Sequence, residues 1–480
     1  MKAPFSAEPI ETVAASDKRS GNPGPFGGYY APVEAPIDAE ITRTDRGTSL
    51  GEYMRKFWQP VCLASDLRDV PLAIRILGED LVAFRDLSGN VGVLARRCAH
   101  RGASLEYGII AEHGIRCCYH GWQFDVDGRV LSTPGEPLGS RLKDSVCQGA
   151  YPAFEKSGLV FAYMGPPAEK PPVPEYEAHA FPPDNKIVPF SNFLPCNWLQ
   201  VHENIADQAH AVFLHVGMTI DPDAKAGEGT QLNASFGIMP TLEWVETRDG
   251  SGMVFIAGRR IGDRIWIRIN DLLLPNITQH AHLFEDGEKP KIFANHLSMT
   301  RWAVPVDDTH TQLFGWRYFN DLVDPEHRGD ASKCGKEKID FLDGQVGNRP
   351  YEEGQRNPGD WEVLTSQGPI SSHKLEHPGT TDAGLFLWRR LVRRAIRGQA
   401  PGASAEAIAS LTRRCNPLPM YSQDSVLNIP ARDGTDDQRL MREIGRRVFD
   451  IIVEADGVDP AARDSYIREQ IRALEKTASA

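Results

Sequence analysis

Long apolar runs, an excess of basic charge and a high density of cysteine are all missing from this sequence of 480 residues. No stretch approaches the roughly 18 apolar residues that a membrane-spanning helix needs, and the first residues lack the apolar core of a secretory signal. A cytoplasmic protein without a membrane partner is therefore expected. The net charge of −12 argues against nucleic acid as a partner, because phosphate binding requires a basic face.

Eight cysteines in a chain of this length and expected compartment do not indicate a disulfide framework. Some are candidates for metal binding, and the others for buried apolar packing. The sequence also lacks a G-x-G-x-x-G run that opens a βαβ unit, and the C-x4-C-x2-C run of plant-type ferredoxins. No flavin, nicotinamide or plant-type ferredoxin module is therefore expected. The cysteines are Cys62, Cys98, Cys117, Cys118, Cys147, Cys196, Cys334 and Cys415.

The length predicts two or three packed units rather than one core. Residues 1–58 are expected to form an N-terminal arm and a short helix. Residues 59–165 contain short strands separated by turns, which predicts a small antiparallel β domain. A proline-rich connector at 165–174 then leads to a larger domain, residues 166–480. The expected fold class is α+β, with helices covering an antiparallel sheet in the larger domain.

Local patterns predict individual elements within these units. Alternating apolar residues indicate strands, and a 3.6-residue apolar period indicates helices. Strands are expected at 73–77, 81–84, 241–247, 253–257 and 264–270, a hairpin at 124–131, and helices at 49–58, 382–397, 437–455 and part of 198–215.

A pair of cysteine–histidine motifs lies in the small β domain. Cys98 and His100 form C-x-H, and Cys117 and His120 form C-x2-H after sixteen intervening residues. Two such loops together offer two thiolates to one iron and two imidazoles to another, the ligand set of a Rieske [2Fe–2S] cluster. A structural zinc site is the main alternative, although zinc ligands are usually spaced by two to four residues. Cys118 with His120 also reads as C-x-H, so spacing alone does not choose between Cys117 and Cys118.

A second candidate metal site is the run Asp207-x2-His210-x4-His215. Non-haem Fe(II) oxygenases bind iron through two histidines and one carboxylate on one face of an octahedron. Five residues turn an ideal helix by about 140°, so both histidines can reach one ion only if the helix ends or bulges between them. Asp207 is expected to share a helix face with His210 and to orient its ring, with a helix N-cap or a direct ligand as alternatives. His202, eight residues before His210, is another candidate ligand. On spacing alone, His210 and His215 are equally well explained as two buried histidines that bind no metal.

Composition leaves the third iron ligand open, because there are 65 acidic residues. The metal motifs and three further runs resemble the phthalate 4,5-dioxygenase group of Rieske oxygenases, aromatic ring-hydroxylating enzymes with one type of subunit. The resemblance covers roughly residues 40–400, and is also visible at 77–85 and 163–167. The three runs are Asn197-Trp-Leu-Gln200, Ser366-Gln-Gly-Pro-Ile370 and Leu375-Glu-His377 with the following Thr381-Asp382.

The resemblance implies a ligand for each metal. Cys98 and Cys117 would hold one cluster iron, and His100 and His120 would hold the other. His210, His215 and Asp360 would hold the mononuclear iron. Asp360 has a helix N-cap as its alternative reading. The sequence departs from the family pattern at Ala99 and Cys118, where proline is usual, and at Gly359, where a polar residue is usual.

The resemblance also implies how electrons reach the iron. Asp207 would link a cluster histidine of one subunit to an iron-bound histidine of the next, in a homotrimer or a multiple of it. A separate NAD(P)H-dependent reductase of flavin or ferredoxin type would supply the electrons. The arginine-rich stretch 385–398 is a candidate docking face for an acidic partner, although a solvated helix face is the simpler interpretation.

The resemblance implies that the enzyme uses O2 and acts on a small aromatic substrate, which is expected to carry a carboxylate. A carboxylate calls for an arginine in the pocket; Arg259, Arg260, Arg264 and Arg268 are candidates, with surface positions favoured instead. Hydroxylation, dihydroxylation and oxidative O- or N-demethylation use the same iron site, so the sequence does not separate them. A Rieske electron carrier and a zinc-bound binding protein are the competing classes. The roughly 300 residues beyond the first motif, with their own metal motif, argue against both.

Overall fold

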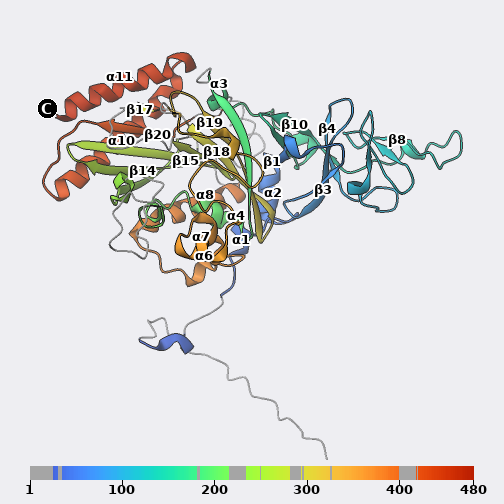
Figure 1. Ribbon diagram of the computed structural model, residues 1–480, viewed down its shortest axis with the longest axis horizontal. Helices are drawn as coiled ribbons and strands as arrows, with labels where there is room; N and C mark the ends of the chain where they lie inside the picture. The colour runs from blue at the N-terminus through green and yellow to red at the C-terminus, as the bar shows by residue number, and fades with distance from the viewer. Residues whose placement is uncertain are drawn as a thin grey trace, which may run out of the picture.

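Antiparallel sheets organise the protein in the computed structural model, with the small sheets at one end and the large sheet at the other (Figure 1). Most of the arm at 1–37, and Cys415, lie outside the described residues. None of the described helices is long and apolar enough to cross a membrane. The structure describes residues 25–30, 35–180, 184–215, 234–248, 250–281, 293–294, 297–324, 327–398, 418 and 420–479.

Three small sheets follow one another in the first part of the chain. Their strand orders are β1-β11-β10, β2-β3-β4-β9 and β5-β6-β7-β8. Strand β3 alternates between two cores: Val82 and Phe84 pack under the cysteine loops, whereas Leu81 and Ala83 face the large core shared with the rest of the protein. The bounds are β1 Trp58–Leu63, β2 Leu72–Ile76, β3 Glu79–Arg85, β4 Val91–Ala95, β5 Ile109–Ile110, β6 Ile115–Arg116, β7 Gln123–Phe124, β8 Val130–Ser132, β9 Ala150–Tyr151, β10 Ala153–Lys156 and β11 Leu159–Tyr163.

One nine-stranded sheet forms the centre of the larger part. Its order is β12-β19-β18-β16-β15-β14-β13, and β20 pairs with both β15 and β17. The sheet brings β16 and β18 next to each other, which becomes important for the site because both strands line it. The bounds are β12 Lys186–Leu194, β13 Thr241–Glu246, β14 Gly252–Ile261, β15 Arg264–Leu273, β16 Ile277–Ala281, β17 Phe293–Ala294, β18 Leu297–Asp307, β19 His310–Phe319 and β20 Gln423–Leu427.

Helices cover both faces of this sheet. Met253, Phe255 and Ala257 of β14 share a core with α8, whereas Val254 and Ile256 share a second core with α10. Figure 1 shows α10 and α11 on one side of the sheet and α4, α7 and α8 on the other. The bounds are α1 Ala39–Thr42, α2 Ser49–Arg55, α3 Glu177–Ala180, α4 Trp198–Glu203, α5 His210–Leu214, α6 Tyr351–Arg356, α7 Asp360–Ser366, α8 Ala383–Ile396, α10 Thr435–Glu454 and α11 Pro460–Ser479.

The α+β class predicted from the sequence is confirmed, with helices covering an antiparallel sheet. Two element predictions needed correction. The expected helix at 49–58 ends at Arg55, because Trp58 already begins β1 and pairs with Tyr163. Strand β14 extends to Ile261, so Arg259 and Arg260 lie within the strand and not after it.

Candidate metal centres

The two cysteine–histidine loops have the same backbone pattern. In each loop the cysteine N–H donates to the carbonyl five residues later, and the N–H four residues later donates back to the cysteine carbonyl. Gly102 and Gly121 occupy that fourth position with φ of 74° and 73°, a left-handed conformation that glycine adopts without strain. Cys98 and Cys117 are therefore equivalent positions. The donor–acceptor pairs are Cys98–Ala103 at 2.8 Å, Gly102–Cys98 at 2.8 Å, Cys117–Trp122 at 2.8 Å and Gly121–Cys117 at 3.0 Å.

The structure separates the two neighbouring cysteines that spacing could not. Cys117 is buried and its thiol interacts with that of Cys98, whereas Cys118 is exposed. Burial, with the neighbouring Cys117 thiol, raises the pKa of Cys98 to about 11. A thiol in this environment gives up its proton only when a cation replaces it, which fits a metal ligand.

The two histidines of these loops lie against each other. The ring centroids of His100 and His120 are 4.5 Å apart, and Trp122 stacks on His100 at 4.6 Å and 3°. His100 Nδ1 is buried and has no hydrogen-bond partner among the described residues, as expected for an atom whose partner is a metal ion. No three ligand atoms of the four residues lie within 4.8 Å of one another, whereas all four would in a tetrahedral zinc site. One cysteine pair and one histidine pair instead fit a two-iron cluster.

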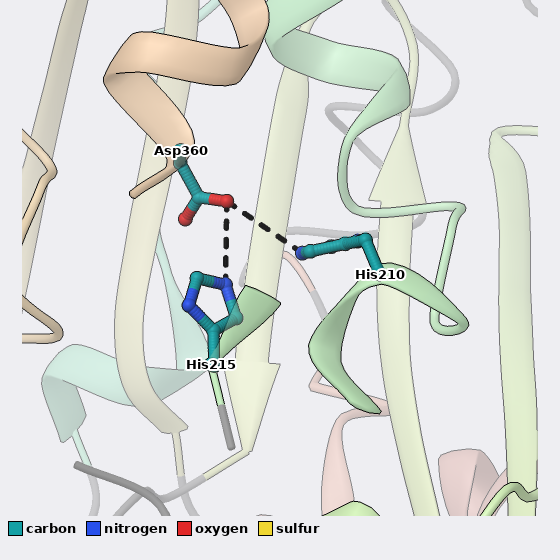
Figure 2. A group of neighbouring side chains, drawn as sticks. All are labelled: His210, His215 and Asp360. Atoms are coloured by element: carbon teal, nitrogen blue, oxygen red, sulfur yellow. Dashed lines mark ion pairs between the residues drawn. The ribbon is translucent and has the colours of Figure 1, made fainter. Parts of the chain in front are cut away.

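Two histidines and one carboxylate converge in the larger part. His210, His215 and Asp360 each offer one ligand atom, and these atoms lie within 4.8 Å of one another. Figure 2 shows both rings directed at one carboxylate oxygen: Asp360 Oδ1 is 3.6 Å from His210 Nε2 and 3.3 Å from His215 Nε2. Helix α5 begins at His210 and ends at Leu214, so His215 follows its last turn. The predicted helix end between the two histidines is therefore present.

Asp360 is held by two amides from different segments. It is the first residue of α7, while Gly359 occupies the N-cap position. Asn204 Nδ2 donates to Oδ1 at 3.2 Å and Gln345 Nε2 donates to Oδ2 at 2.6 Å. Burial alone raises the pKa of Asp360, but His215 and His210 outweigh it and hold the pKa well below its usual range. The carboxylate is therefore ionised and ready to bind a cation.

Asp207 lies beside His210 and not on its helix. The expectation of a shared helix face is wrong, because α5 starts only at His210. Asp207 Oδ1 accepts the backbone N–H groups of Ala209 and His210 at 2.9 and 3.2 Å, which fixes the start of the helix. Its Oδ2 is 3.8 Å from His210 Nδ1, beyond hydrogen-bond distance, and that nitrogen has no partner among the described residues. Asp207 thus lies at the edge of the iron site.

The structure removes one alternative iron ligand and corrects the expected surface placement of two arginines. His202 lies against Trp388 with ring centroids 4.4 Å apart, and it is absent from the ligand group. Arg268 is not a surface charge but a buried partner of Asp424, with Nη1 to Oδ2 at 2.7 Å. Arg259 is fully buried as well.

Helix α8 does not present a free basic face. Three of its four arginines, and Arg397 directly after it, form ion pairs within the chain, because acidic side chains from distant segments approach the helix. The pairs are Arg389 with Glu203 and Glu376, Arg393 with Asp38 and Glu40, Arg394 with Glu246, and Arg397 with Glu40.

Sequence reasoning missed several residues that shape the iron site. Asn204, Gln345 and Arg301 gave no local signal, because only the fold brings them to Asp360 or to the adjoining cavity. Asn204 lies between the run Asn197–Gln200 and the motif that begins at Asp207, and this position is the one hint that the sequence offered for it.

A Rieske-type loop pair and a two-histidine, one-carboxylate site on an α+β fold define a class: iron-dependent oxygenases that contain their own iron–sulfur cluster. Residues 57–143 match the Rieske [2Fe-2S] domain family. The tert-butanol monooxygenase / tert-amyl alcohol desaturase oxygenase subunit of Aquincola tertiaricarbonis is 51% identical over 92% of this chain and 94% of that protein. The phenoxybenzoate dioxygenase subunit alpha of Ectopseudomonas oleovorans is 36% identical over 77% of this chain and 87% of that protein.

The structure of NdmA with caffeine, from Pseudomonas putida CBB5, has the same fold. It matches with a TM-score of 0.51 and 21% identity over 75% of this chain and 96% of that chain. The chain belongs to the Rieske non-haem iron oxygenases. The expected class of enzyme and its two cofactors, a Rieske [2Fe–2S] cluster and a mononuclear iron, are confirmed at the level of the family.

Proposed function

We propose that this chain is a terminal oxygenase that hydroxylates a small tertiary alcohol. The single observation that carries the proposal is the 51% identity to a tert-butanol monooxygenase subunit along nearly the whole of both chains. The substrate of such a reaction offers only unactivated C–H bonds. For tert-butanol, one methyl C–H bond and O2, with two electrons and two protons, give a 1,2-diol and water.

The ligands of both metals are part of this proposal. Cys98 and Cys117 hold one cluster iron, His100 and His120 hold the other, and His210, His215 and Asp360 hold the mononuclear iron. The bound iron supplies the activation of O2. The protein orients Asp360 for this role: the side-chain amides of Asn204 and Gln345 donate hydrogen bonds to the carboxylate, so that one of its oxygens faces both imidazoles.

We also propose the partners and the assembly. A separate NAD(P)H-dependent reductase delivers the electrons. Asp207 carries them from a cluster histidine of a neighbouring subunit to His210, in a homotrimer or a multiple of it. Asp207 lines a groove of about 680 Å³, together with Phe213 and Leu385. This groove has room for a surface segment of a neighbouring subunit. The domain boundaries proposed are 1–58, 59–165 and 166–480, in keeping with the separate sheets before and after the connector.

Oxidation of an aromatic acid is the second candidate. The 36% identity to a phenoxybenzoate dioxygenase subunit favours it, and the family resemblance of the sequence points the same way. Dihydroxylation and oxidative demethylation are both possible outcomes of that chemistry. A simple electron carrier is not proposed, because it has no use for the second iron site.

The test is a single turnover with isotopically labelled O2. The iron-loaded, chemically reduced protein is mixed with tert-butanol or with an aromatic acid, and products are identified by mass spectrometry. Diol carrying one labelled oxygen is expected from tert-butanol. Labelled product only from the aromatic acid would replace the first candidate by the second.

A further inference from the structure

A small cavity adjoins the proposed iron ligands. It has a volume of about 60 Å³, and His210, His215 and Asp360 form one side of it. Four further lining side chains come from three neighbouring strands, β15, β16 and β18, of the large sheet. They are Arg268, Asn270, His280 and Arg301. Apolar side chains such as Ile205, Phe236 and Phe341 complete the lining, so the cavity combines polar groups with apolar surface, as binding pockets do.

Arg268, the first charge in this wall, is neutralised within the protein. It forms its ion pair with Asp424, which also accepts a hydrogen bond from Trp266 Nε1 at 3.0 Å. Arg259 does not line the cavity: its guanidinium lies 5.4 Å from the ring centre of Phe236 and 5.2 Å from that of Trp266, its Nε donates to the Ile238 carbonyl, and its two terminal nitrogens have no hydrogen-bond partner among the described residues. Arg268 lines the cavity but is not available to a substrate without breaking its ion pair.

Arg301 is different. It is only 5% exposed and it lines the cavity. Its Nε donates to Thr278 Oγ1 at 3.3 Å, while its two terminal nitrogens have no hydrogen-bond partner among the described residues. Burial lowers its pKa to about 10 and the Asp360 carboxylate opposes this shift, so the guanidinium still carries its charge at neutral pH. A buried charge with unused donors calls for an acceptor to complete its shell.

Thr278 connects Arg301 to His280. Thr278 and Arg301 are opposite each other across β16 and β18, and Thr278 Oγ1 is also 3.4 Å from His280 Nε2. Since the Arg301 nitrogen can only donate, the Thr278 oxygen accepts there, and the same hydroxyl can either donate to His280 Nε2 or accept from it. Burial holds the pKa of His280 well below its ordinary value, so this ring is neutral.

Arg301 thus brings a buried positive charge to the cavity that the iron ligands also line. We propose that Arg301, aligned by Thr278 and supported by His280, binds an acceptor oxygen of the substrate and so determines which substrates are accepted. The oxygen belongs to the hydroxyl of a small alcohol or to a carboxylate. This inference rests on the proposed function for the identity of the iron site, but not for the choice of a tertiary alcohol.

The cavity volume restricts the rest of the substrate. A cavity of about 150 Å³ holds benzene, with six heavy atoms, so about 60 Å³ holds roughly two or three. The cavity therefore fits the oxygen-bearing end of a substrate, and the carbon atoms next to that oxygen then lie close to the iron ligands that line the same cavity. An anchored oxygen therefore selects both the molecule and the C–H bond that is presented.

Binding is tested separately from turnover. The Fe(II)–nitric oxide adduct of the mononuclear site gives an EPR signal that changes when a substrate binds beside it. Titrations use tert-butanol, pivalate and neopentane, the last having the shape of tert-butanol without its oxygen. Arg301→Gln is expected to raise the Kd of the preferred oxygen-bearing ligand by about tenfold to a hundredfold, and to leave that of neopentane unchanged.

Two further variants guard against a simple loss of structure. Arg301→Lys keeps the charge and is expected to recover part of the affinity, and Thr278→Val is expected to weaken binding several-fold by releasing Arg301. Arg260→Gln is the control, because Arg260 pairs with Asp437 outside the cavity. Normal cluster spectra and iron content identify folded variants.

The outcomes distinguish this inference from the proposed function. Equal Kd values for the wild type, Arg301→Gln and Thr278→Val would overturn the acceptor subsite, even if tert-butanol is hydroxylated. If binding depends on Arg301 but tert-butanol is not turned over, the acceptor subsite stands and the proposed tertiary-alcohol substrate is wrong. Tighter binding of pivalate than of tert-butanol would assign the site to a carboxylate.

Discussion

Gln345 donates to Asp360 Oδ2 at 2.6 Å, on the carboxylate oxygen that does not face the two histidines. The other oxygen, Oδ1, is the one nearest to His210 and His215. Gln345 thus occupies Oδ2, whereas Oδ1 faces both histidines and accepts only the longer hydrogen bond from Asn204 Nδ2, at 3.2 Å. This arrangement favours a single Asp360–iron bond through Oδ1, which keeps coordination positions open for O2.

Replacing Gln345 should loosen the iron. Gln345→Leu leaves Asp360 Oδ2 buried without its donor, and we expect Fe(II) affinity to fall by about tenfold to a hundredfold. Competition with a coloured chelator measures this directly. Gln355→Leu is the matched control, because Gln355 is an exposed residue of α6 whose side chain donates to the Tyr351 hydroxyl, away from the iron site. Unchanged affinity in Gln345→Leu would refute a role for this hydrogen bond.

The two adjacent cysteines should respond in opposite ways to the same substitution. Cys117→Ser removes a buried thiol that faces Cys98, and we expect the cluster to be lost. Cys118→Ser changes an exposed side chain, and we expect iron, sulfide and visible spectrum to stay at wild-type levels. Loss of the cluster in Cys118→Ser alone would reverse the ligand assignment.

Electron transfer between subunits predicts complementation. Cys98→Ala lacks the cluster and His210→Ala lacks the mononuclear iron, so each variant alone should be inactive. In randomly mixed assemblies, about a quarter of the sites combine an intact cluster from one subunit with an intact iron site from its neighbour. Co-expression of the two variants should therefore restore about that fraction of wild-type activity. Complete inactivity of verified mixed assemblies would mean that electrons stay within one chain.

His202 should make the protein sensitive to mild acid. Burial, helped by Arg301, lowers the pKa of His202 to about 3, so the folded state resists protonation that the unfolded chain accepts near its ordinary value. The stability from this group is complete above that ordinary value and declines as the pH falls. At about pH 5 the loss is of the order of 2 kcal/mol.

The measurement compares thermal unfolding at neutral pH and at about pH 5. His202→Phe keeps a ring against Trp388 and should lose less stability on acidification than the wild type. His327→Gln, at an exposed histidine, is the control and should follow the wild type. An equal acid-induced loss of stability in all three proteins would show that burial of His202 does not cause the acid sensitivity.

Local geometry allowed part of this site to be predicted from the sequence. Because five helical residues separate two side chains by about 140°, a helix end between His210 and His215 had to exist if both bind one ion. Asp360 could be named only through the family resemblance, since nothing in its own neighbourhood distinguishes it from other acidic residues.

Long-range packing explains what the sequence did not reveal. Arg301 reaches the cavity through the pairing of β18 with β16, and Gln345 comes from a loop that meets α7 only in the folded chain. The arginines of α8 look solvated in sequence, yet Glu40 of the first helix pairs with Arg393 and Glu203 of α4 pairs with Arg389. Such partners depend on the tertiary fold, which no local pattern contains.

The most direct test of the whole account is metal analysis with low-temperature EPR of the protein, purified without oxygen and reduced with dithionite. The account predicts a Rieske-type signal and about three irons per chain, two in the cluster and one in the mononuclear site. Stoichiometric zinc without a Rieske signal would contradict it.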